Sequence, residues 1–422
     1  MTNVLHLLKE VEVAFKEMKK ALSIFLFIVP VVCFSQTEFV VNDGVDIRIN
    51  PGCQVIFAEG GMQNNSGEFS NAGELIVEGS ILNNGLLSGG ASSGMFRVLN
   101  DVQNNGQMQP GQSTFELYGD NQFLRGFQQL NFYNLSLTGS GVKYMLQAIQ
   151  TAGTLDLNDR ELRATGNTVF HINPTPATVL ATHDQGFVSA DAGGGLSRVT
   201  NSSQDYFYPV GSTQNNFKIR PVTIAPSGGT NTYKVRYVPG PTPNSAQRSS
   251  ELYYVNPIFY HDMQRTDGTS SAGITVFYDE AADGLFETLA HQESSFWTEN
   301  VGTIEGPTIG TGPELISYKT PDWDFTTPEI ALAAYATEIF VPNVFSPNDD
   351  GFNDIFKPRG TEPFEYEMRI YDRWGNLVFE SKVLDQGWDG TFKGKLMNSG
   401  VFVYYILGAG EVINKGNVTL LR

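Results

Sequence analysis

An Asn-Asn-Gly turn that recurs about every twenty residues is the feature that most constrains the fold of this chain. It occurs at Asn64–Gly67, where a serine precedes the glycine, and again at Asn83–Gly85 and Asn104–Gly106, at intervals of 19 and 21 residues. A period near twenty is typical of one coil of a parallel β-helix, in which stacked coils share a core that no single coil can bury alone. Stacking also aligns the asparagines, and we expect their amides to hydrogen-bond along the stack.

We expect this repeat array to occupy residues 36–200. It weakens after Gln109–Gly111 and continues in looser form through Phe132–Leu137 and Gly153–Leu157. The turn glycines are expected to supply the left-handed backbone conformations that sharp corners need. Because Asn-Gly is also the strongest short hairpin signal, a set of ordinary antiparallel hairpins is the alternative.

Residues 201–337 show a different pattern, in which apolar or aromatic residues alternate with polar ones. Alternation with period two is typical of a strand with one buried face. The runs that show it are Tyr206–Gly211, Phe217–Ile224, Tyr233–Val238, Ile274–Tyr278 and Phe296–Thr298. Glycine, proline and asparagine separate these runs, and the pattern predicts a middle β-sandwich.

Residues 338–422 predict a third, smaller β-sandwich. Met368–Tyr371, Leu377–Phe379 and Val401–Leu407 are β-branched or aromatic runs separated by turn residues. A last apolar run, Val418–Leu421, precedes Arg422. We expect that run to form the edge strand of its sheet, where another chain can add a strand.

The composition agrees with an all-β chain of several domains. The 422 residues include 44 glycines, 29 phenylalanines and 17 tyrosines, and only 17% are charged. Turn-rich, aromatic-rich and helix-poor chains of this kind are usually all-β. The formal net charge is −18, which disfavours nucleic acid and anionic membranes as partners because both require clustered Lys and Arg.

Residues 1–35 predict an upstream extension followed by a secretory signal peptide. Met18–Lys20 forms a short basic region, and the apolar stretch Ala21–Val32 that follows is too short for a comfortable membrane span. Ser35 is a small residue at a suitable cleavage position, and Met18 is the expected true start.

Two alternatives to a cleaved signal involve the membrane. One is an amphipathic helix that leads into a membrane anchor, and the other is a lipoprotein on Cys33, whose neighbours fit a lipobox poorly. Cleavage after residue 35 leaves Cys53 as the single cysteine, so no intrachain disulfide is expected.

Four blocks near the end of the sequence carry a family resemblance. They are Val341–Asp354, Tyr371–Asn376, Gly387–Gly390 and Gly400–Tyr405. In this order and at these intervals they resemble the gliding motility-associated C-terminal domain, the type B sorting domain by which Bacteroidetes-type bacteria send proteins through the type IX secretion system. The resemblance covers about a fifth of the chain.

The resemblance implies an Ig-like β-sandwich that the type IX machinery recognises after folded passage through the periplasm, and it leaves open an outer-membrane attachment partner. Trp374 and Trp388 are expected to be core residues beside glycine turns. The residues that the resemblance assigns to sorting and recognition are Pro342, Asn343, Phe345, Pro347, Asn348, Asp349, Asp350, Gly351, Asn353, Asp354, Tyr371, Arg373, Trp374, Gly375, Trp388, Asp389, Gly390, Gly400 and Tyr404.

The first block also contains a loop rich in oxygen ligands. Asn348, Asp350 and Asp354 surround Gly351, and calcium prefers such hard ligands. The spacing is not that of an EF-hand, because no glutamate follows at the required position. The alternative is a turn in which Asn and Asp side chains cap their own backbone. No other cofactor is expected.

The body of the chain offers an enzymatic alternative. A polysaccharide lyase or glycosidase on the β-helix would use Asp156 and Asp159 with Arg160 or Arg163. The same residues are equally well explained as a strand end and a turn, so we expect no catalysis.

Aromatic residues of the middle region offer a binding alternative, because aromatic faces stack on sugar rings. Tyr253–Tyr254, Phe259–Tyr260 and Trp297 are the candidates for an extracellular glycan, although such residues are more often sandwich core. The sequence therefore predicts an exported or cell-surface protein whose body is a non-catalytic adhesin or surface-structural element.

Overall fold

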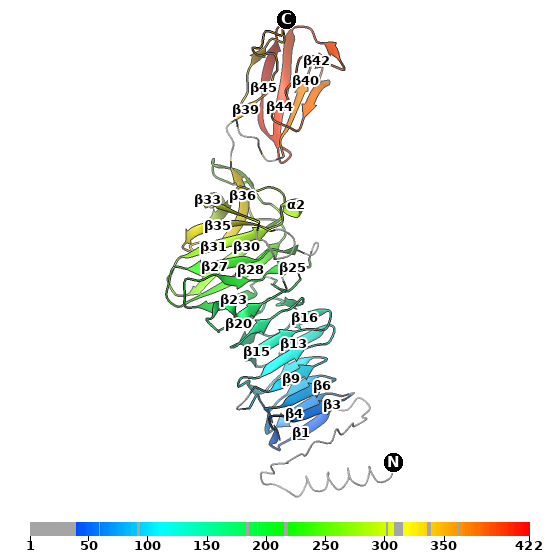
Figure 1. Cartoon of the computed structure of the whole chain (residues 1–422), viewed down its shortest axis with the longest axis vertical. Coiled ribbons are helices and arrows are strands. Elements are labelled where there is room, and N and C mark those ends of the chain that lie inside the picture. The colour runs from blue at the N-terminus through cyan, green and yellow to red at the C-terminus, as the bar shows by residue number, and fades with distance from the viewer. Residues whose placement is uncertain are drawn as a thin grey trace. The chain divides into compact units, whose positions relative to one another are not determined.

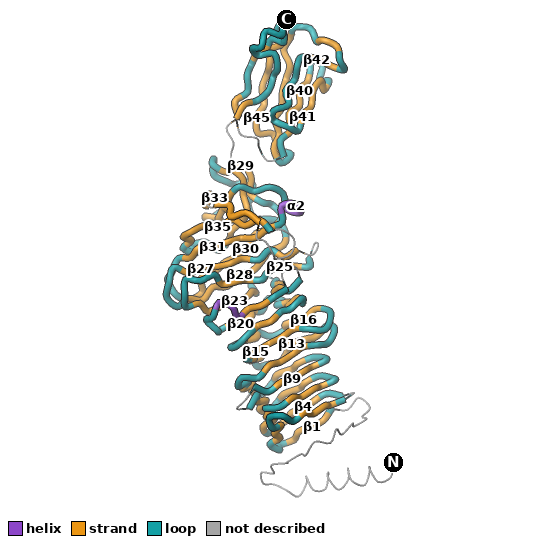
Figure 2. The backbone as a smooth tube through the Cα atoms, viewed as in Figure 1, coloured by secondary structure: helices purple, strands orange, loops and turns teal. Residues whose placement is uncertain are grey.

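The computed structural model describes residues 39–422 apart from 59, 91–92, 183–184, 192, 215–217, 301–302, 308–314, 336–338, 361–362 and 364. The predicted signal peptide and upstream extension lie outside the described residues. Strand and loop dominate the described part, and Figure 2 shows helix there in η1 (Pro176–Thr178) and α2 (Glu280–Asp283). No helix of the described part is long and apolar enough to cross a membrane.

The chain forms two compact units that interleave along the sequence. The first contains the described parts of residues 1–240, 259–279 and 305–329, and the second those of residues 241–258, 280–304 and 330–422.

A parallel β-solenoid of about seven coils opens the described part of the first unit (Figure 1). Each coil contributes one strand to each of three faces. The first face is β1 (Val40–Asp43), β4 (Met62–Ser66), β7 (Ile81–Asn83), β10 (Val102–Asn104), β13 (Gln122–Gly126), β16 (Val142–Met145), β19 (Glu161–Arg163) and β22 (Phe187–Ser189).

The other two faces follow the same order. The second begins with β2 (Ile47–Ile49), β5 (Glu68–Asn71), β8 (Leu86–Ser88) and β11 (Gln107–Gln109) and continues with β14 (Leu130–Phe132), β17 (Ile149–Thr151), β20 (Thr168–His171) and β23 (Gly195–Thr200). The third is β3 (Gln54–Phe57), β6 (Glu74–Val77), β9 (Met95–Val98), β12 (Thr114–Leu117), β15 (Asn134–Leu137), β18 (Leu155–Asp156) and β21 (Val179–Leu180). The second face consists of two sheets that divide between β11 and β14. Within each sheet of the coils, neighbouring strands pair in parallel, for example β4 with β7 and β7 with β10. The solenoid prediction is confirmed, and the hairpin alternative is wrong.

Apolar side chains at equivalent positions of successive coils stack through the interior. Leu75, Phe96 and Phe115 are in register on the third face and are at most 1% exposed. The rings of Phe96 and Phe115 stack with their centroids 4.2 Å apart at an interplanar angle of 10°. Burial of this kind is shared between neighbouring coils, so each coil depends on the next for its core.

A ladder of buried asparagines runs up one corner of the solenoid. Asn42 donates to Asn64 Oδ1 at 2.8 Å, Asn64 to Asn83 Oδ1 at 2.9 Å, and Asn83 to Asn104 Oδ1 at 2.8 Å. All four side chains are at most 3% exposed. The predicted amide stacking is therefore confirmed, and the ladder ends at Gly126, which is in register with Asn104.

Each ladder amide also binds the backbone of the next coil. The second amide hydrogen of Asn64 goes to Leu86 O at 3.1 Å and that of Asn83 to Gln107 O at 3.0 Å. Asn104, the last residue of the ladder, donates to Gln129 O at 2.9 Å. These carbonyls lie just beyond the corner, where the chain leaves one face for the next. The ladder thus supplies hydrogen-bond partners that a buried backbone requires.

Two of the three turn glycines allow neighbouring coils to approach closely and do not adopt a left-handed backbone conformation. Gly67 has φ of +81°, but Gly85 and Gly106 do not have positive φ. A Cβ atom at Gly106 would lie 2.1 Å from Gly85 O, and one at Gly85 would lie 2.8 Å from Gly67 O. The expectation of left-handed turns is therefore wrong for these two residues. Glycine is needed there because a side chain would collide with the neighbouring coil.

The solenoid passes into the middle β-sandwich without a break in the sheet. β23 pairs in parallel with β20 and antiparallel with β28 (Asn231–Pro239), which pairs antiparallel with β30 (Phe259–Asp267). A small pair, β25 (Gly211–Ser212) and β26 (Lys218–Ile219), lies beside them. The facing sheet is β24 (Tyr206–Tyr208), β27 (Val222–Pro226), β31 (Ala272–Tyr278), β35 (Ile316–Trp323) and β34 (Thr303–Pro307). The predicted boundary at residue 200 falls at the end of β23 and stays a prediction.

A buried arginine joins the two sheets near this transition. Arg198 of β23 is fully buried; it donates to Phe207 O at 2.7 Å and to Pro176 O at 2.8 Å. Its guanidinium lies over the rings of Tyr206 and Tyr208, 5.3 and 5.7 Å from their centroids. Burial lowers the pKa of Arg198 to about 10, so the residue stays charged at neutral pH.

The second unit contributes an antiparallel sheet from the middle region. Its strands are β29 (Leu252–Val255), β36 (Glu329–Tyr335), β32 (Thr288–Glu293) and β33 (Phe296–Asn300). Trp297 of β33 is fully buried and donates from Nε1 to Pro243 O at 2.7 Å. The suggestion that Trp297 stacks on sugars is therefore wrong, because its ring belongs to the core.

The C-terminal part of the second unit is a separate five-stranded sheet. Its order is β38 (Val344–Phe345), β45 (Glu411–Leu420), β44 (Gly400–Gly408), β40 (Glu367–Tyr371) and β41 (Leu377–Ser381). Two short pairs accompany it, β37 (Ile339–Phe340) with β39 (Arg359–Gly360) and β42 (Thr391–Phe392) with β43 (Lys395–Leu396).

The last strand is not the plain edge that the sequence suggested. β38 pairs in parallel with the end of β45, with Val344 opposite Thr419 and Phe345 opposite Leu420. The short strand that begins the domain therefore covers the end of the last one. In the described structure, the part of β45 before Val418 has β44 as its pairing strand.

The buried ladder should contribute more to stability than the exposed turn residues beside it. Asn83→Ala removes two donated hydrogen bonds and one accepted bond at a fully buried position, so we expect unfolding free energy to fall by about 2–4 kcal/mol. The control Asn84→Ala, on the exposed side of the same turn, should change it by about 0.5 kcal/mol. Urea unfolding followed by circular dichroism measures both, and equal losses would contradict a structural role for the ladder.

Candidate functional site

The four motif blocks meet at one end of the C-terminal sheet. β45 ends beside the end of β38 and the start of β44, because Leu420 is paired with both Phe345 and Gly400. β40 runs against β44 and ends with Tyr371 opposite Val403. The loops that follow β38 and β40 therefore lie at this same end, which is called the shared loop end below.

The third block joins them through a glycine. Gly390 has φ of +77°, and a Cβ atom there would lie 3.2 Å from Pro347 and 3.1 Å from Leu420. Pro347 belongs to the first block, and Leu420 lies two residues before Arg422. The structure thus brings together segments that are separated by up to about 75 residues in the sequence.

Three of the residues predicted to serve sorting belong to the buried core of this domain. Phe345, Trp388 and Tyr404 are at most 7% exposed. The ring of Trp388 lies 5.3 Å from that of Phe345, and its Nε1 donates to Thr391 O at 2.8 Å. The expectation that Trp388 is a core residue is confirmed.

Trp374, in contrast, is not a core residue. Its side chain is 77% exposed, and the Arg373 guanidinium lies 5.4 Å from the ring centroid. Asp372 holds the turn by accepting from the backbone N–H groups of Trp374 at 2.8 Å and Asn376 at 2.9 Å. The Asn376 side-chain amide and these N–H groups lower the pKa of Asp372. The turn is closed by its own groups, so the indole is left free to face solvent.

The oxygen-rich loop is also closed by its own hydrogen bonds. Asp354 Oδ1 accepts from Asn348 N at 2.9 Å and Asp349 N at 2.8 Å, and its Oδ2 accepts from Gly351 N at 2.8 Å. Desolvation raises the pKa of Asp354, but these N–H groups together outweigh it and hold the pKa below its ordinary value.

Asp350 makes equivalent bonds within the loop. Its Oδ1 accepts from Phe352 N at 2.8 Å and its Oδ2 from the Asn348 amide at 2.9 Å. Asp349 and Asn353 have left-handed φ of 61° and 54°, conformations that Asn and Asp tolerate better than most residues. The geometry supports the capped-turn alternative, and no group of three His, Cys, Asp or Glu suited to a metal is found in the described part of the chain.

The remaining predicted residues hold the segments in place. Asn343, preceded by Pro342, accepts Thr419 N through its carbonyl at 2.9 Å, and Asp389 accepts Thr391 N at 2.9 Å. Tyr371 packs edge-on against Tyr405 with centroids 5.9 Å apart. Gly375 has φ of +80° in its turn, and Gly400 is the first residue of β44.

Three exposed apolar residues of this domain were not predicted as surface residues from the sequence. Phe352 is 77% exposed in the oxygen-rich loop, and Phe340 and Leu396 are 67% and 69% exposed. The sequence did contain a signal for their exposure: they are large apolar side chains in turn-forming segments, and a turn has no buried face for them. Phe352 and Trp374 each belong to a loop of the shared loop end.

Comparison with known families decides what this domain is. Residues 339–420 match the CHU_C type IX secretion signal domain. The CHU_C domain contains all four motif blocks, so the chain carries a C-terminal sorting domain and is exported by type IX secretion to the cell surface or beyond. No curated protein and no solved structure matches the chain.

The enzyme-like residues of the solenoid are paired with their neighbours. Asp156 Oδ1 accepts Asn158 N at 3.0 Å, and Arg160 Nε donates to Asp159 Oδ1 at 2.8 Å. That bond from Arg160 lowers the pKa of Asp159. Arg163 donates to Glu161 at 2.8 Å. The arrangement fits a strand end and turn, and the expected absence of catalysis stays a prediction.

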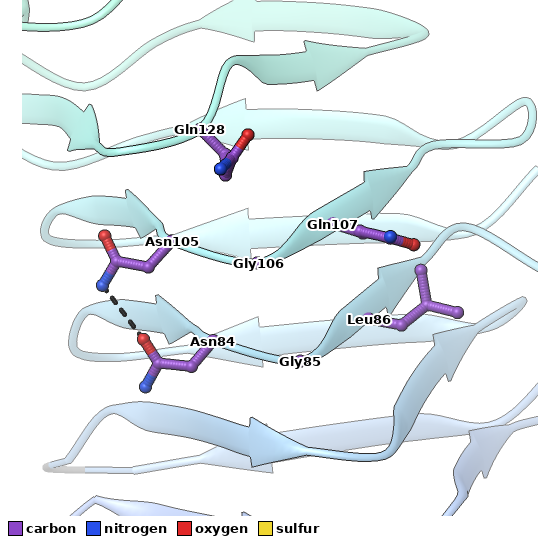
Figure 3. A pocket seen from close by; sticks show the side chains of 7 residues that line it. All are labelled: Asn84, Gly85, Leu86, Asn105, Gly106, Gln107 and Gln128. Carbon is purple, nitrogen blue, oxygen red and sulfur yellow. Dashed lines mark hydrogen bonds between the residues drawn. The ribbon is translucent and has the colours of Figure 1, made fainter.

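The solenoid surface carries a groove that was not predicted from the sequence. It has a volume of about 450 Å³ and crosses three successive corners, lined by Asn84, Gly85, Leu86, Asn105, Gly106, Gln107 and Gln128. Figure 3 shows the side chains of Asn84 and Asn105 on one side of the two glycines and those of Leu86 and Gln107 on the other. The Asn-Asn-Gly repeat contained the signal, because glycines that allow close stacking also leave a hollow beside the aligned amides.

The two tryptophans of the CHU_C domain should respond differently to truncation. Trp388→Ala empties a buried site and should lower the unfolding free energy by about 3–5 kcal/mol. Trp374→Ala, in which an exposed ring is removed, should change it by at most about 0.5 kcal/mol. Thermal melting of the purified full chain, followed by tryptophan fluorescence, compares them. A large loss of unfolding free energy in Trp374→Ala would contradict the solvent exposure of this ring.

Calcium should have little effect on the oxygen-rich loop, since the carboxylate oxygens of Asp350 and Asp354 already bind groups of the loop itself. We expect the same melting temperature for the full chain with added calcium and with excess chelator. A rise of several degrees with calcium that disappears in Asp354→Asn would instead assign a calcium site to Asn348, Asp350 and Asp354.

Proposed function

We propose that the body of this exported chain is a non-catalytic adhesin or surface-structural element, held outside the cell by the sorting route that the CHU_C domain provides. The observation that carries the proposal is the solenoid itself. Its interior is filled by stacked apolar residues and by the asparagine ladder, so the coils present their outer faces to other molecules.

The groove supports a binding role over a catalytic one. Its lining consists of amides, glycines and a leucine. Amides donate and accept hydrogen bonds but do not exchange protons near neutral pH, whereas general acid–base catalysis requires a group that does. A surface of this kind is suited to holding a polar partner.

We further propose that the shared loop end of the CHU_C domain contacts the type IX machinery through its exposed aromatic residues. Trp374 and Phe352 are both 77% exposed, and each is carried by a turn that its own aspartates close. Exposed aromatics on rigid supports are typical contact residues of protein interfaces. Passage through the periplasm and an outer-membrane attachment partner belong to the same proposal.

Removal of residues 339–422 should prevent export. Wild-type chain should be recovered from the culture medium or cell surface, and the truncated chain should remain inside the cell, as immunoblots of the fractions will show. Normal secretion of the truncated chain would refute the sorting role.

A finer variant tests the loop end without removing the domain. Phe352→Ala/Trp374→Ala should reduce the exported fraction severalfold at unchanged melting temperature. The control is Val412→Ala, which is 51% exposed at the start of β45, away from the shared loop end. Export of the double variant at the wild-type level would place recognition elsewhere on the domain.

The enzymatic alternative has its own readout. If the secreted body is a polysaccharide-active enzyme, the purified chain releases reducing ends from polysaccharides, and Asp159→Asn abolishes the release. We expect no release, and turnover of any tested polysaccharide would contradict the adhesin proposal.

A further inference from the structure

We propose that the groove over Gly85 and Gly106 binds an extended, uncharged polysaccharide, and that the exposed ring of Phe127 supports one of its sugar units. The inference rests on the proposed adhesive function and names the class of its ligand. Three observations carry it: the spacing of the asparagine amides, the free hydrogen-bonding capacity of two glutamine amides, and the exposed aromatic ring of the residue that precedes Gln128.

The amides form a regular row outside the buried ladder. Asn84 donates to Asn65 Oδ1 at 3.4 Å and Asn105 donates to Asn84 Oδ1 at 3.0 Å. Because these residues lie on successive coils, the row repeats at the spacing of parallel strands, about 4.8 Å. One sugar unit of an extended β-linked chain has nearly this length, so consecutive units meet equivalent groups.

Phe127 follows the row of amides on the next coil. Gly126 is in register with Asn104, which places Phe127 one coil beyond Asn105, and Phe127 N donates to Asn105 Oδ1 at 3.2 Å. The Phe127 side chain is 84% exposed. A phenyl ring so exposed gains nothing from the core, but its face suits the C–H face of a sugar ring.

The groove keeps hydrogen-bonding groups that the fold does not use. Within the described structure, no hydrogen bond is found for the side-chain amides of Gln107 and Gln128, and both side chains are exposed. Each amide offers two donors and a carbonyl acceptor, which match hydroxyl groups that both donate and accept. The buried ladder differs, because its amides already bind one another and the backbone.

Charge favours a neutral ligand. The lining residues are uncharged, and the chain carries a net charge of −18. Arg125, on the strand that leads to Phe127, is paired with Asp101 at 3.2 Å. An anionic polysaccharide would meet repulsion from the whole chain without a free cation in the groove to offset it.

Affinity electrophoresis of the purified, secreted full chain tests the inference. The probes are hydroxyethylcellulose, xylan and mannan as neutral chains and alginate as an anionic one. Gln107→Ala/Gln128→Ala removes the two exposed amides, and Phe127→Ala removes the ring. The matched control is Gln185→Ala/Gln247→Ala, which removes two exposed glutamines outside the groove. Melting temperatures of all variants establish that they are folded.

We expect retardation by at least one neutral polysaccharide, a dissociation constant raised at least about tenfold by each groove variant, and no change in the control. No retardation by any neutral probe, or equal retardation of wild type and groove variants, would overturn the inference. Preferential binding of alginate would do so as well.

Two further outcomes separate this inference from the proposed function. A concentration-dependent dimer that is lost in the groove variants would identify the groove as an interface between copies of the chain, and the polysaccharide inference would be wrong. Adhesion to cells or surfaces that the groove variants retain would leave the adhesive function standing and refute the groove as its site.

Discussion

The buried asparagine ladder is the interaction on which the first coils of the solenoid depend. A coil of about twenty residues has to turn three times, and at each corner some backbone carbonyls lose their strand partners inside the core. Asn64 and Asn83 solve this by binding both the next asparagine and a carbonyl of the next coil, and Asn104 binds a carbonyl of the next coil. The ladder fixes the register of the coils, and the register then aligns the outer amides and the stacked phenylalanines.

Much of the fold follows from the sequence because the repeat and the alternation are local signals. The Asn-Asn-Gly period predicted the parallel coils and the ladder, and the motif blocks predicted the sorting domain. The side on which a residue lies was harder to predict. Trp374 and Trp388 have similar glycine neighbours, yet one is 77% exposed and the other fully buried, because burial depends on which segments fold back over each turn. The groove was missed for the same reason: it forms between coils, and no single coil contains it.

In the CHU_C domain, aspartate side chains bind backbone groups of the loops, as asparagine side chains bind backbone groups of the solenoid. Asp354 and Asp372 each gather backbone N–H groups of their own loop and so hold a tight turn without help from the core. A loop closed in this way can display Phe352 or Trp374 to solvent and still keep one shape. For the contact with the type IX machinery that we propose for these loops, a fixed display has the advantage that little conformational entropy is lost on binding.

The change of strand direction at β23 has a consequence for assembly. A stack of parallel coils has no intrinsic length, and its last rung offers open N–H and C=O groups to any further coil, including one from another molecule. β23 accepts the antiparallel β28 in that position, and a strand running the opposite way cannot continue the winding. On this face, the sandwich therefore blocks the addition of a further parallel coil.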